Sequence, residues 1–266
     1  YVGGTSGLIY GYVNDGFYKV EDFEYFDSKS RTWKLKEGVV DSSPLSDTPR
    51  PGNAKFKKLT PVDPNSSNPY QLTEADRTVI GNTTPKFSGG FGLNATYKGF
   101  DLSMFFNFMY DFDVFNANKV MLTTWADNHE NNFGMEVASD KRWRNFDDMG
   151  NEIRYSPELL AEFNKNATMW NPTSIGKPIS MSYAVEDGSF LRLNSATLGY
   201  TLPQEWTKKA GLNKVRFYVA GSNLFTITGY SGYDPEVDIA TGLTPNIDNN
   251  RYPRSRTYTF GAQLTF

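Results

Sequence analysis

The segment FSGGFGLNATYKGFDLSMFFNFMY, residues 87–110, decides the fold class. Its apolar residues recur at every second position, first over 87–97 and again over 100–110, on either side of Lys98-Gly99. A period of two residues is typical of a β-strand with one apolar and one polar face, and a two-residue turn with glycine is typical of a hairpin. The segment therefore predicts one long antiparallel hairpin.

Three further segments carry the same alternation. Segment 257–266 alternates cleanly and ends with Phe266 in phase with its apolar face. In segment 189–202 the apolar residues occupy odd-numbered positions at the start and even-numbered positions at the end. A β-bulge near Asn194-Ser195 would place both groups on one face of the strand. Segment 214–225 has charged residues on its second face, which we expect to meet water.

The connections between these strands are strongly unequal in length. Two are short, and the long ones, 1–86, 111–188 and 226–255, are polar and rich in Asn, Asp, Gly and Pro. Transmembrane β-barrels have short periplasmic turns, long extracellular loops and aromatic residues at both strand ends. Aromatic residues near the predicted strand ends are Tyr97, Phe100, Tyr110, Tyr200 and Tyr258. We therefore expect an all-β chain of membrane-barrel strands, although a soluble half-buried sheet alternates in the same way.

The composition excludes several other classes. The chain has 266 residues, no cysteine, one histidine and a net charge of -3. No disulfide or thiolate metal site is possible without cysteine, and no apolar run reaches the roughly 18 residues of a membrane helix. The chain has no basic block, so that we expect no nucleic-acid partner.

Five collinear blocks resemble the C-terminal part of the SusC/RagA class of TonB-dependent outer-membrane transporters. The blocks are DRTVIGNTTPKFSGGF (76–91), TYKGFDLSMFF (96–106), VEDGSFLRLNSATLGYTLP (185–203), RFYVAGSNLFTITGYSGYDPEV (216–237) and RSRTYTFGAQLTF (254–266). The weaker match GLIYGYVNDGFY (7–18) looks like the loop that precedes these blocks in the family. The resemblance covers most of the chain but only the last part of a typical member.

The resemblance implies the C-terminal strands of a large antiparallel barrel with 22 strands, whose plug domain, TonB-contacting segment and remaining strands are absent from this sequence. Residues 1–86 would be an extracellular loop region leading into the barrel, and residues 87–266 would hold the last strands with long loops at 111–188 and 226–255. Because five strands are fewer than the roughly eight of the smallest membrane barrels, we expect the outer two strands to pair with absent ones.

The resemblance also implies a function and partners. The family imports oligosaccharides or oligopeptides across the outer membrane of Gram-negative bacteria, driven through TonB and with a SusD-like surface lipoprotein as a lid. It implies a multi-pass barrel in the lipid bilayer, no cofactor and no enzymatic activity. A passive porin and a secreted β-rich carbohydrate-binding protein remain alternatives, and the sequence does not decide between glycan and peptide.

Aromatic side chains in the long loops are the candidates for substrate contact, because sugars stack on aromatic rings. The candidates are Trp125, Trp143, Trp170, Tyr230 and Tyr233. The alternative is that these rings hold the long loops together. A separate group resembles the signal read by the barrel assembly machinery, namely Tyr258, Phe260, Leu264 and Phe266.

Metal binding and catalysis receive little support. Asp63, Asn65, Ser67 and Glu74 have the spacing of a calcium loop, but Asn68 replaces its glycine, so that we predict no metal site. The single histidine, His129, lies in a polar loop, and no carboxylate pair has a separation that the sequence can fix. The apolar spacing in 157–166 predicts a short loop helix.

Overall fold

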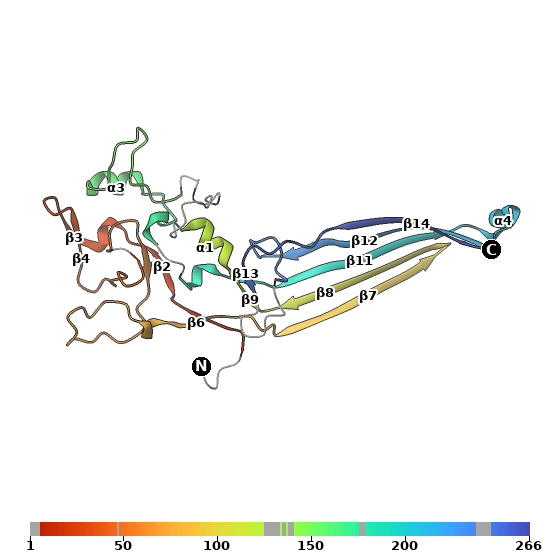
Figure 1. Ribbon diagram of the computed structural model, residues 1–266, viewed down its shortest axis with the longest axis horizontal. Helices are drawn as coiled ribbons and strands as arrows, with labels where there is room; N and C mark the ends of the chain where they lie inside the picture. The colour runs from red at the N-terminus through yellow and green to blue at the C-terminus, as the bar shows by residue number, and fades with distance from the viewer. Residues whose placement is uncertain are drawn as a thin grey trace. The chain divides into compact units, whose positions relative to one another are not determined.

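The computed structural model describes residues 6–46, 48–124, 134, 137, 141–175, 179–237 and 246–266. The chain divides into two compact units. The sheet unit comprises residues 82–114, 186–246 and 250–266, and the loop unit comprises residues 1–81, 115–185 and 247–249. Figure 1 labels the elements of both units.

The sheet unit contains one antiparallel five-stranded sheet with the order β14-β12-β11-β8-β7 (Figure 1). Its strands are β7 (Phe87–Tyr97), β8 (Phe100–Tyr110), β11 (Phe190–Thr201), β12 (Lys214–Thr228) and β14 (Thr257–Thr265). The predicted hairpin is present, because β7 and β8 pair along their whole length. Lys98 and Gly99 both have positive φ, 48° and 86°, as a type I′ turn requires. The all-β prediction is confirmed.

A bulge in β11 keeps its apolar residues on one face. The register of β11 shifts between Leu193 and Ser195 against both of its neighbours. On β12 the irregularity coincides with Asn223, whose φ of 53° is left-handed. The shift leaves Leu193 opposite Phe106 and Leu198 opposite Leu102, two positions in the same phase of β8. The predicted bulge near Asn194-Ser195 is therefore confirmed.

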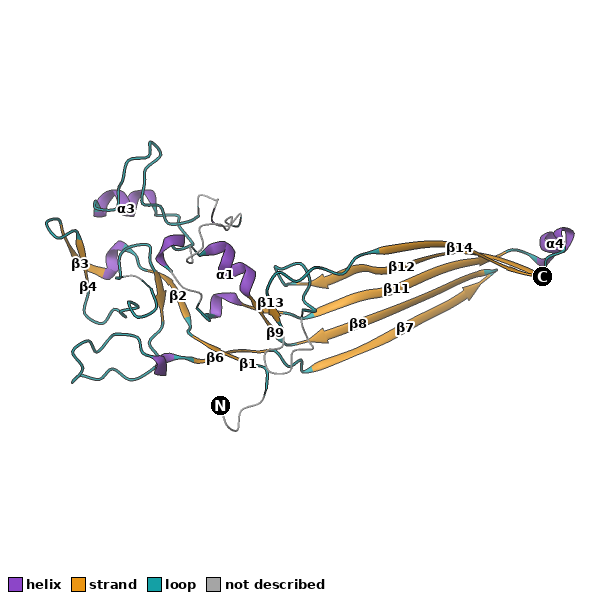
Figure 2. Cartoon of the chain, in the orientation of Figure 1, coloured by secondary structure: helices purple, strands orange, loops and turns teal. Residues whose placement is uncertain are grey.

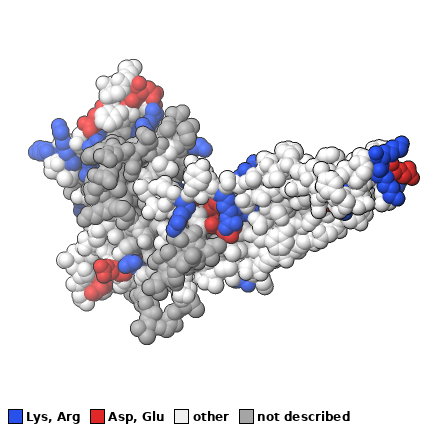
Figure 3. All heavy atoms as spheres, turned by 45° about the vertical axis from the view of Figure 1, so that its right-hand side comes forward, with Lys and Arg blue, Asp and Glu red and all other residues white. Residues whose placement is uncertain are grey.

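One face of the sheet is apolar along its length and exposed. Phe260, Phe87 and Tyr258 expose 77 %, 64 % and 61 % of their surface. The ring of Phe91 stacks on that of Phe106 at 4.9 Å, so that the face is ordered by cross-strand pairs. Figure 3 shows few charged residues over the strands and more of them at the strand ends. Contiguous apolar surface of this kind requires an apolar environment or a partner.

The remaining elements are short (Figure 2). The paired strands are β1 (Leu8–Gly11) with β6 (Thr78–Asn82), β2 (Asn14–Phe17) with β5 (Ala54–Phe56), β3 (Phe23–Asp27) with β4 (Thr32–Leu35), and β13 (Ile247–Asp248) parallel to β9 (Asp113–Asn116). β10 (Val185–Asp187) pairs with the other edge of β9, which completes a three-stranded sheet in the order β10-β9-β13. The others are α1 (Ala117–Thr123), α3 (Pro157–Phe163), α4 (Gln204–Thr207) and the 3-10 turns Val20–Asp22, Glu74–Asp76, Pro172–Ser174, Ser182–Ala184 and Lys208–Ala210. Among the described residues, no helix has the length and apolar character to cross a membrane.

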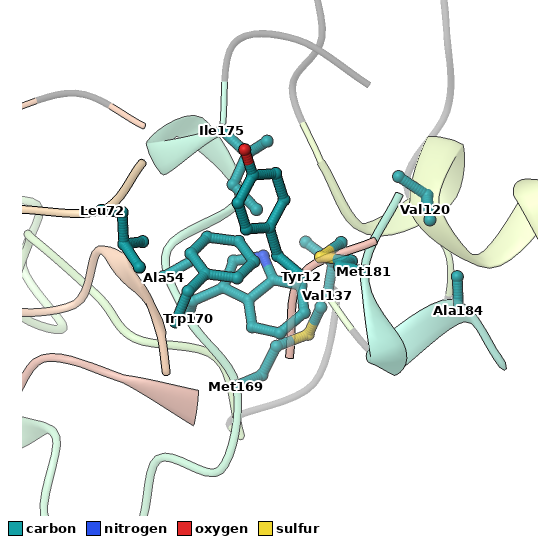
Figure 4. Packing of buried hydrophobic residues seen from close by; sticks show 11 residues of the cluster. Tyr12, Ala54, Leu72, Val120, Val137, Met169, Trp170, Ile175, Met181 and Ala184 are labelled. Carbon is teal, nitrogen blue, oxygen red and sulfur yellow. The ribbon is translucent and has the colours of Figure 1, made fainter. Parts of the chain in front are cut away.

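The loop unit has a hydrophobic core of its own (Figure 4). Its main cluster consists of Tyr12, Ala54, Phe56, Leu72, Val120, Val137, Met169, Trp170, Ile175, Met181 and Ala184. These residues come from both of the long polar stretches, 1–86 and 111–188, which the sequence suggests are separate loops. The two stretches therefore pack together into one unit, and their extracellular placement stays a prediction.

The predicted loop helix is present as α3. It begins with Pro157 in its first turn, where proline is favoured, and ends at Phe163, three residues before the predicted end. Leu160 is buried against Trp143 and Ile153 in a second cluster of the loop unit. The side chain of Asn164 ends the helix by donating to the carbonyl of Leu160 at 2.9 Å.

Candidate functional site

The aromatic residues predicted to contact substrate lie in different clusters. Trp143 and Trp170 are buried in separate clusters of the loop unit, with 4 % and 3 % of their surface exposed. In the sheet unit, Tyr230 is buried and Tyr233 is 84 % exposed. Trp125 lies outside the described residues. Substrate contact by these residues stays a prediction, and Tyr233 is the described candidate that solvent reaches most freely.

Trp143 holds several loop segments together. Its ring meets that of Phe17 edge to face at 5.6 Å, and its backbone N–H donates to the carbonyl of Met169 at 2.8 Å. Gly52 lies against the indole, since a Cβ there would come within 2.2 Å of the Trp143 ring. This packing agrees with the alternative that the tryptophans hold the loops together.

Gly52→Ala is expected to lower the stability of the loop unit clearly more than Gly38→Ala. Both glycines have left-handed φ, 88° and 87°, so both substitutions cost about 1–2 kcal/mol of backbone strain. Only the Gly52→Ala substitution also causes a collision with Trp143, and overpacking of this kind destabilises a fold by about a further 1–3 kcal/mol. Tryptophan fluorescence during thermal unfolding measures the difference, and equal midpoints for the two variants would contradict the close packing.

A buried ion-pair network anchors the segment around Asp234 in the sheet unit. Arg192 on β11 is 2 % exposed and its Nη2 lies 2.5 Å from Asp234 Oδ1 and 3.7 Å from Glu236 Oε2. Arg254 Nη2 forms an ion pair with the other oxygen of Glu236, Oε1, at 2.7 Å. The backbone N–H of Glu236 also donates to Asp234, at 2.9 Å, and closes a turn around the buried Pro235. The sequence analysis missed Arg192 as the partner of Asp234, because the two residues lie 42 positions apart in the chain.

The second face of the sheet carries a charged pair across three strands. Arg216 on β12 donates to Asp101 on β8 through Nε at 2.9 Å and also through Nη2. The side chain of Arg216 crosses β11 over Gly199, where a Cβ would come within 2.3 Å of its guanidinium. The face is therefore polar as predicted, and glycine is required where the arginine passes.

Asp76, the first residue of one family-like block, is a buried anchor of the loop unit. Its carboxylate is fully buried and accepts from the N–H groups of Leu59, Thr60 and Thr73 at 2.7–2.9 Å and from both threonine hydroxyls. Lys58 Nζ lies 3.4 Å away. Burial alone would raise the pKa of Asp76, but these hydrogen bonds together hold it well below its usual range. Sequence spacing gave no signal for this role.

The calcium-like segment has a local structure of its own. Asp63 Oδ1 accepts from the N–H of Asn65 at 2.9 Å, and both residues are exposed. Glu74 begins a 3-10 turn. Within the part of the chain that the structure describes, no three acidic or histidine side chains are grouped as metal ligands.

The residues that resemble an assembly signal share one face. Tyr258, Phe260 and Leu264 lie on β14 in the same phase, and Phe266 follows them with 84 % of its surface exposed. They continue the apolar face, because Phe260 pairs with Val219. Their part in barrel assembly stays a prediction.

Comparison with known proteins places this architecture among receptors. No protein-family model matches the chain. TonB-dependent receptor P3 of Formosa agariphila is 32 % identical over 99 % of the chain and 22 % of its own length. TonB-dependent receptor P26 of the same organism is 28 % identical over 88 % of the chain and 22 % of its own length. TonB-dependent receptor SusC of Bacteroides thetaiotaomicron is 37 % identical over 32 % of the chain and 8 % of its own length.

Solved structures show the same fold. The RagAB peptide transporter matches 99 % of this chain and 23 % of its own with a TM-score of 0.65 and 22 % identity. The RagAB peptide importer in its open-open state matches 97 % of this chain and 22 % of its own with a TM-score of 0.61 and 22 % identity. At that identity these two similarities establish the fold alone.

Taken with the sheet and its apolar face, the similarities to P3 and P26 define the class as TonB-dependent receptors. The chain belongs to the SusC/RagA family of that class, as the sequence blocks predict. It spans about a fifth of the length of P3 and P26. The relatives bear the names of receptors, transporters and importers rather than of enzymes.

Proposed function

We propose that the chain forms part of a TonB-dependent importer of oligosaccharides or oligopeptides in the outer membrane of a Gram-negative bacterium. In this proposal the sheet unit lies in the bilayer as part of a closed barrel. The loop unit lies on the extracellular side, where a SusD-like lipoprotein acts as a lid, and TonB acts through parts of the protein outside this sequence.

The apolar face of the sheet is the observation that carries the proposal. β7 and β8 each have 11 residues, which at about 3.3 Å per residue span about 36 Å. A tilt of about 40° reduces this to about 28 Å, close to the roughly 30 Å hydrocarbon core of a bilayer. Tyr97 and Phe100 at one end and Phe87 and Tyr110 at the other are 50–69 % exposed, as interfacial aromatic residues would be. The membrane environment thus accounts for surface that water would not stabilise.

The two sheet edges support closure with further strands. β7 and β14 each have one neighbour in the sheet, and every residue of β7 is exposed. An unpaired strand edge in lipid costs several kcal/mol for each unsatisfied backbone group. We therefore infer that strands outside this sequence pair with both edges.

Energy-dependent uptake tests the proposed function. Cells that carry the full-length protein are expected to accumulate a labelled oligosaccharide or a labelled peptide from a screened panel, and to stop when TonB is deleted or a protonophore is added. Deleting a SusD-like surface lipoprotein that co-purifies with the transporter should also lower uptake. Uptake that survives loss of TonB, with ion conductance in a planar bilayer, would favour a passive porin instead.

Fractionation tests the other alternative. The chain is expected in the detergent-extracted outer membrane, within a polypeptide several times larger than 30.0 kDa by intact mass. Recovery of a 30.0 kDa protein from an aqueous fraction would contradict the transporter and favour a secreted carbohydrate-binding protein. No enzymatic turnover of the imported ligand is expected.

A further inference from the structure

A cleft of about 180 Å³ in the loop unit is lined by three arginines. The hairpin of β3 and β4 provides Arg31 and Trp33, the segment 48–50 provides Arg50, and the segment after Ile153 provides Arg154 and Tyr155. Threonine and proline side chains complete the wall, and no carboxylate is among the described residues that line the cleft. The sequence did not single out any of these arginines, which are separated by up to 123 positions.

The three guanidinium groups are only partly neutralised. Arg154 Nε lies 3.3 Å from Glu152 Oε1, but the geometry is unsuited to a hydrogen bond and the buried Nε has no such partner. Arg31 contacts the face of Tyr155 at 4.9 Å and forms no ion pair with any residue that the structure describes. The side chain of Arg50 forms no ion pair or hydrogen bond with the described residues. Among the described residues that line the cleft, positive charge therefore exceeds negative charge.

Aromatic packing fixes the walls of the cleft. Tyr155 stacks on Phe26 at 6.0 Å, and Trp33 contacts Phe26 at 5.0 Å and Phe23 at 5.3 Å. Arg31 is held against Tyr155, so part of the entropy cost of ordering its long side chain is already met before a ligand arrives. Because Phe26 and Arg31 already contact the Tyr155 ring, little of it is free to stack on a neutral sugar.

We propose that this cleft is a subsite for an oxyanion, a carboxylate or sulfate group carried by the imported oligomer. Guanidinium groups present paired N–H donors whose geometry matches these anions, and charge-assisted hydrogen bonds are about twice as strong as neutral ones. The inference rests on the proposed import function and adds that the loop unit selects acidic ligands. Arg50 and Arg154 bind the anion, and Arg31 adds a third, exposed positive charge.

Matched charged and neutral probes test the subsite on the intact transporter with its lipoprotein. The sugar probes are tetragalacturonate and its methyl ester, and the peptide probes are a blocked pentapeptide with two glutamates and its glutamine counterpart. Isothermal titration calorimetry is expected to show at least one acidic probe binding about tenfold or more tightly than its neutral partner, with binding weakened by salt. The probe pair that shows the difference in affinity identifies whether the carboxylate comes from a sugar or from a peptide. Competition by inorganic sulfate tests whether the cleft also binds a sulfate group.

Variants locate the effect in the cleft. Arg50→Gln and Arg154→Gln should each weaken the acidic probe about tenfold and leave the neutral probe unchanged. Arg144→Gln is the charge-matched control, because Arg144 pairs with Asp148 outside the cleft. Arg31→Gln, at an exposed hairpin turn, gives a second test that is independent of buried packing. Unfolding midpoints are measured for every variant.

Three outcomes would overturn the subsite. The first is equal affinity for the acidic and the neutral member of both probe pairs. The second is an effect of Arg144→Gln as large as that of Arg50→Gln. The third is release of the lipoprotein by Arg50→Gln with probe binding unchanged, which would assign the cleft to protein docking. TonB-dependent uptake is measured in the same strains. Uptake that persists without charge selectivity defeats this inference alone, whereas loss of TonB dependence defeats the import function.

Discussion

The Asp76→Ala variant of the full-length protein is expected to lose about 3–5 kcal/mol of the free energy that stabilises its loop unit. The substitution removes an acceptor that serves Leu59, Thr60 and Thr73, and it leaves Lys58, 9 % exposed, without its carboxylate. Buried donors left without partners and a buried uncompensated charge both destabilise a fold. Urea unfolding in detergent, followed through the fluorescence of the buried tryptophans, measures the loss.

The same carboxylate predicts a pH dependence. Because the pKa of Asp76 is lowered in the folded protein, its stabilising contribution is complete above the ordinary aspartate value near 3.8 and is lost as the pH falls through the lower folded value. The loop unit should therefore weaken only below about pH 4. The Asp76→Asn variant, which cannot titrate, should lack this component.

Two comparisons make the Asp76 prediction specific. Asp76→Asn keeps one oxygen for Leu59 and Thr60 but turns an amide toward the donors of Thr73, so an intermediate loss is expected. Asp63→Ala removes an exposed carboxylate whose bond is to the N–H of Asn65, and it should change stability by less than about 1 kcal/mol. Equal effects of Asp63→Ala and Asp76→Ala would show that Asp76 is not an anchor.

The sequence predicts the sheet well because its signal is local. Alternation over 87–110 needs only neighbouring residues to specify two strand faces, and Lys98-Gly99 supplies the turn between them. The bulge at Asn194 was predictable for the same reason, since a change of phase can be seen within one strand. Periodicity alone could not show that two long polar stretches share one core, because contacts between distant residues join them. The N–H of Tyr12 donates to the carbonyl of Ser180, and the N–H of Ala54 donates to the hydroxyl of Ser174.

The candidate sites were less predictable because they depend on contacts between distant residues. Aromatic content in a loop does not distinguish Trp143, which is buried, from Tyr233, which is exposed. The residues that organise charge were missed, since the partners of Asp76 and Asp234 lie elsewhere in the chain. Arg192 is a charged residue inside a resemblance block, and it lies neither on the apolar face nor in a turn. That position was the available signal for a buried ion pair.

Arg192→Met is expected to release the segment around Asp234 and to lower the stability of the sheet unit by about 3–5 kcal/mol. Methionine replaces the apolar stem of Arg192 but leaves Asp234 and Glu236, each 12 % exposed, without the guanidinium between them. Two neighbouring buried carboxylates then repel each other, and water or protons must enter to compensate. Thermal unfolding of the purified full-length protein and protease cleavage of the segment after Tyr230 measure the effect.

Arg254→Gln provides the matched control, because Arg254 binds the same Glu236 but is 45 % exposed. Its loss should cost less than about 1 kcal/mol, as is typical of exposed ion pairs. Combining Arg192→Met with Asp234→Asn and Glu236→Gln should recover stability, because the amides that replace the two carboxylates carry no charge to be compensated. Recovery would show that Arg192 acts by neutralising them. No recovery would show that the guanidinium itself is needed for packing. Equal losses of stability in Arg192→Met and Arg254→Gln would contradict the prediction, which depends on the difference between a buried and an exposed ion-pair partner.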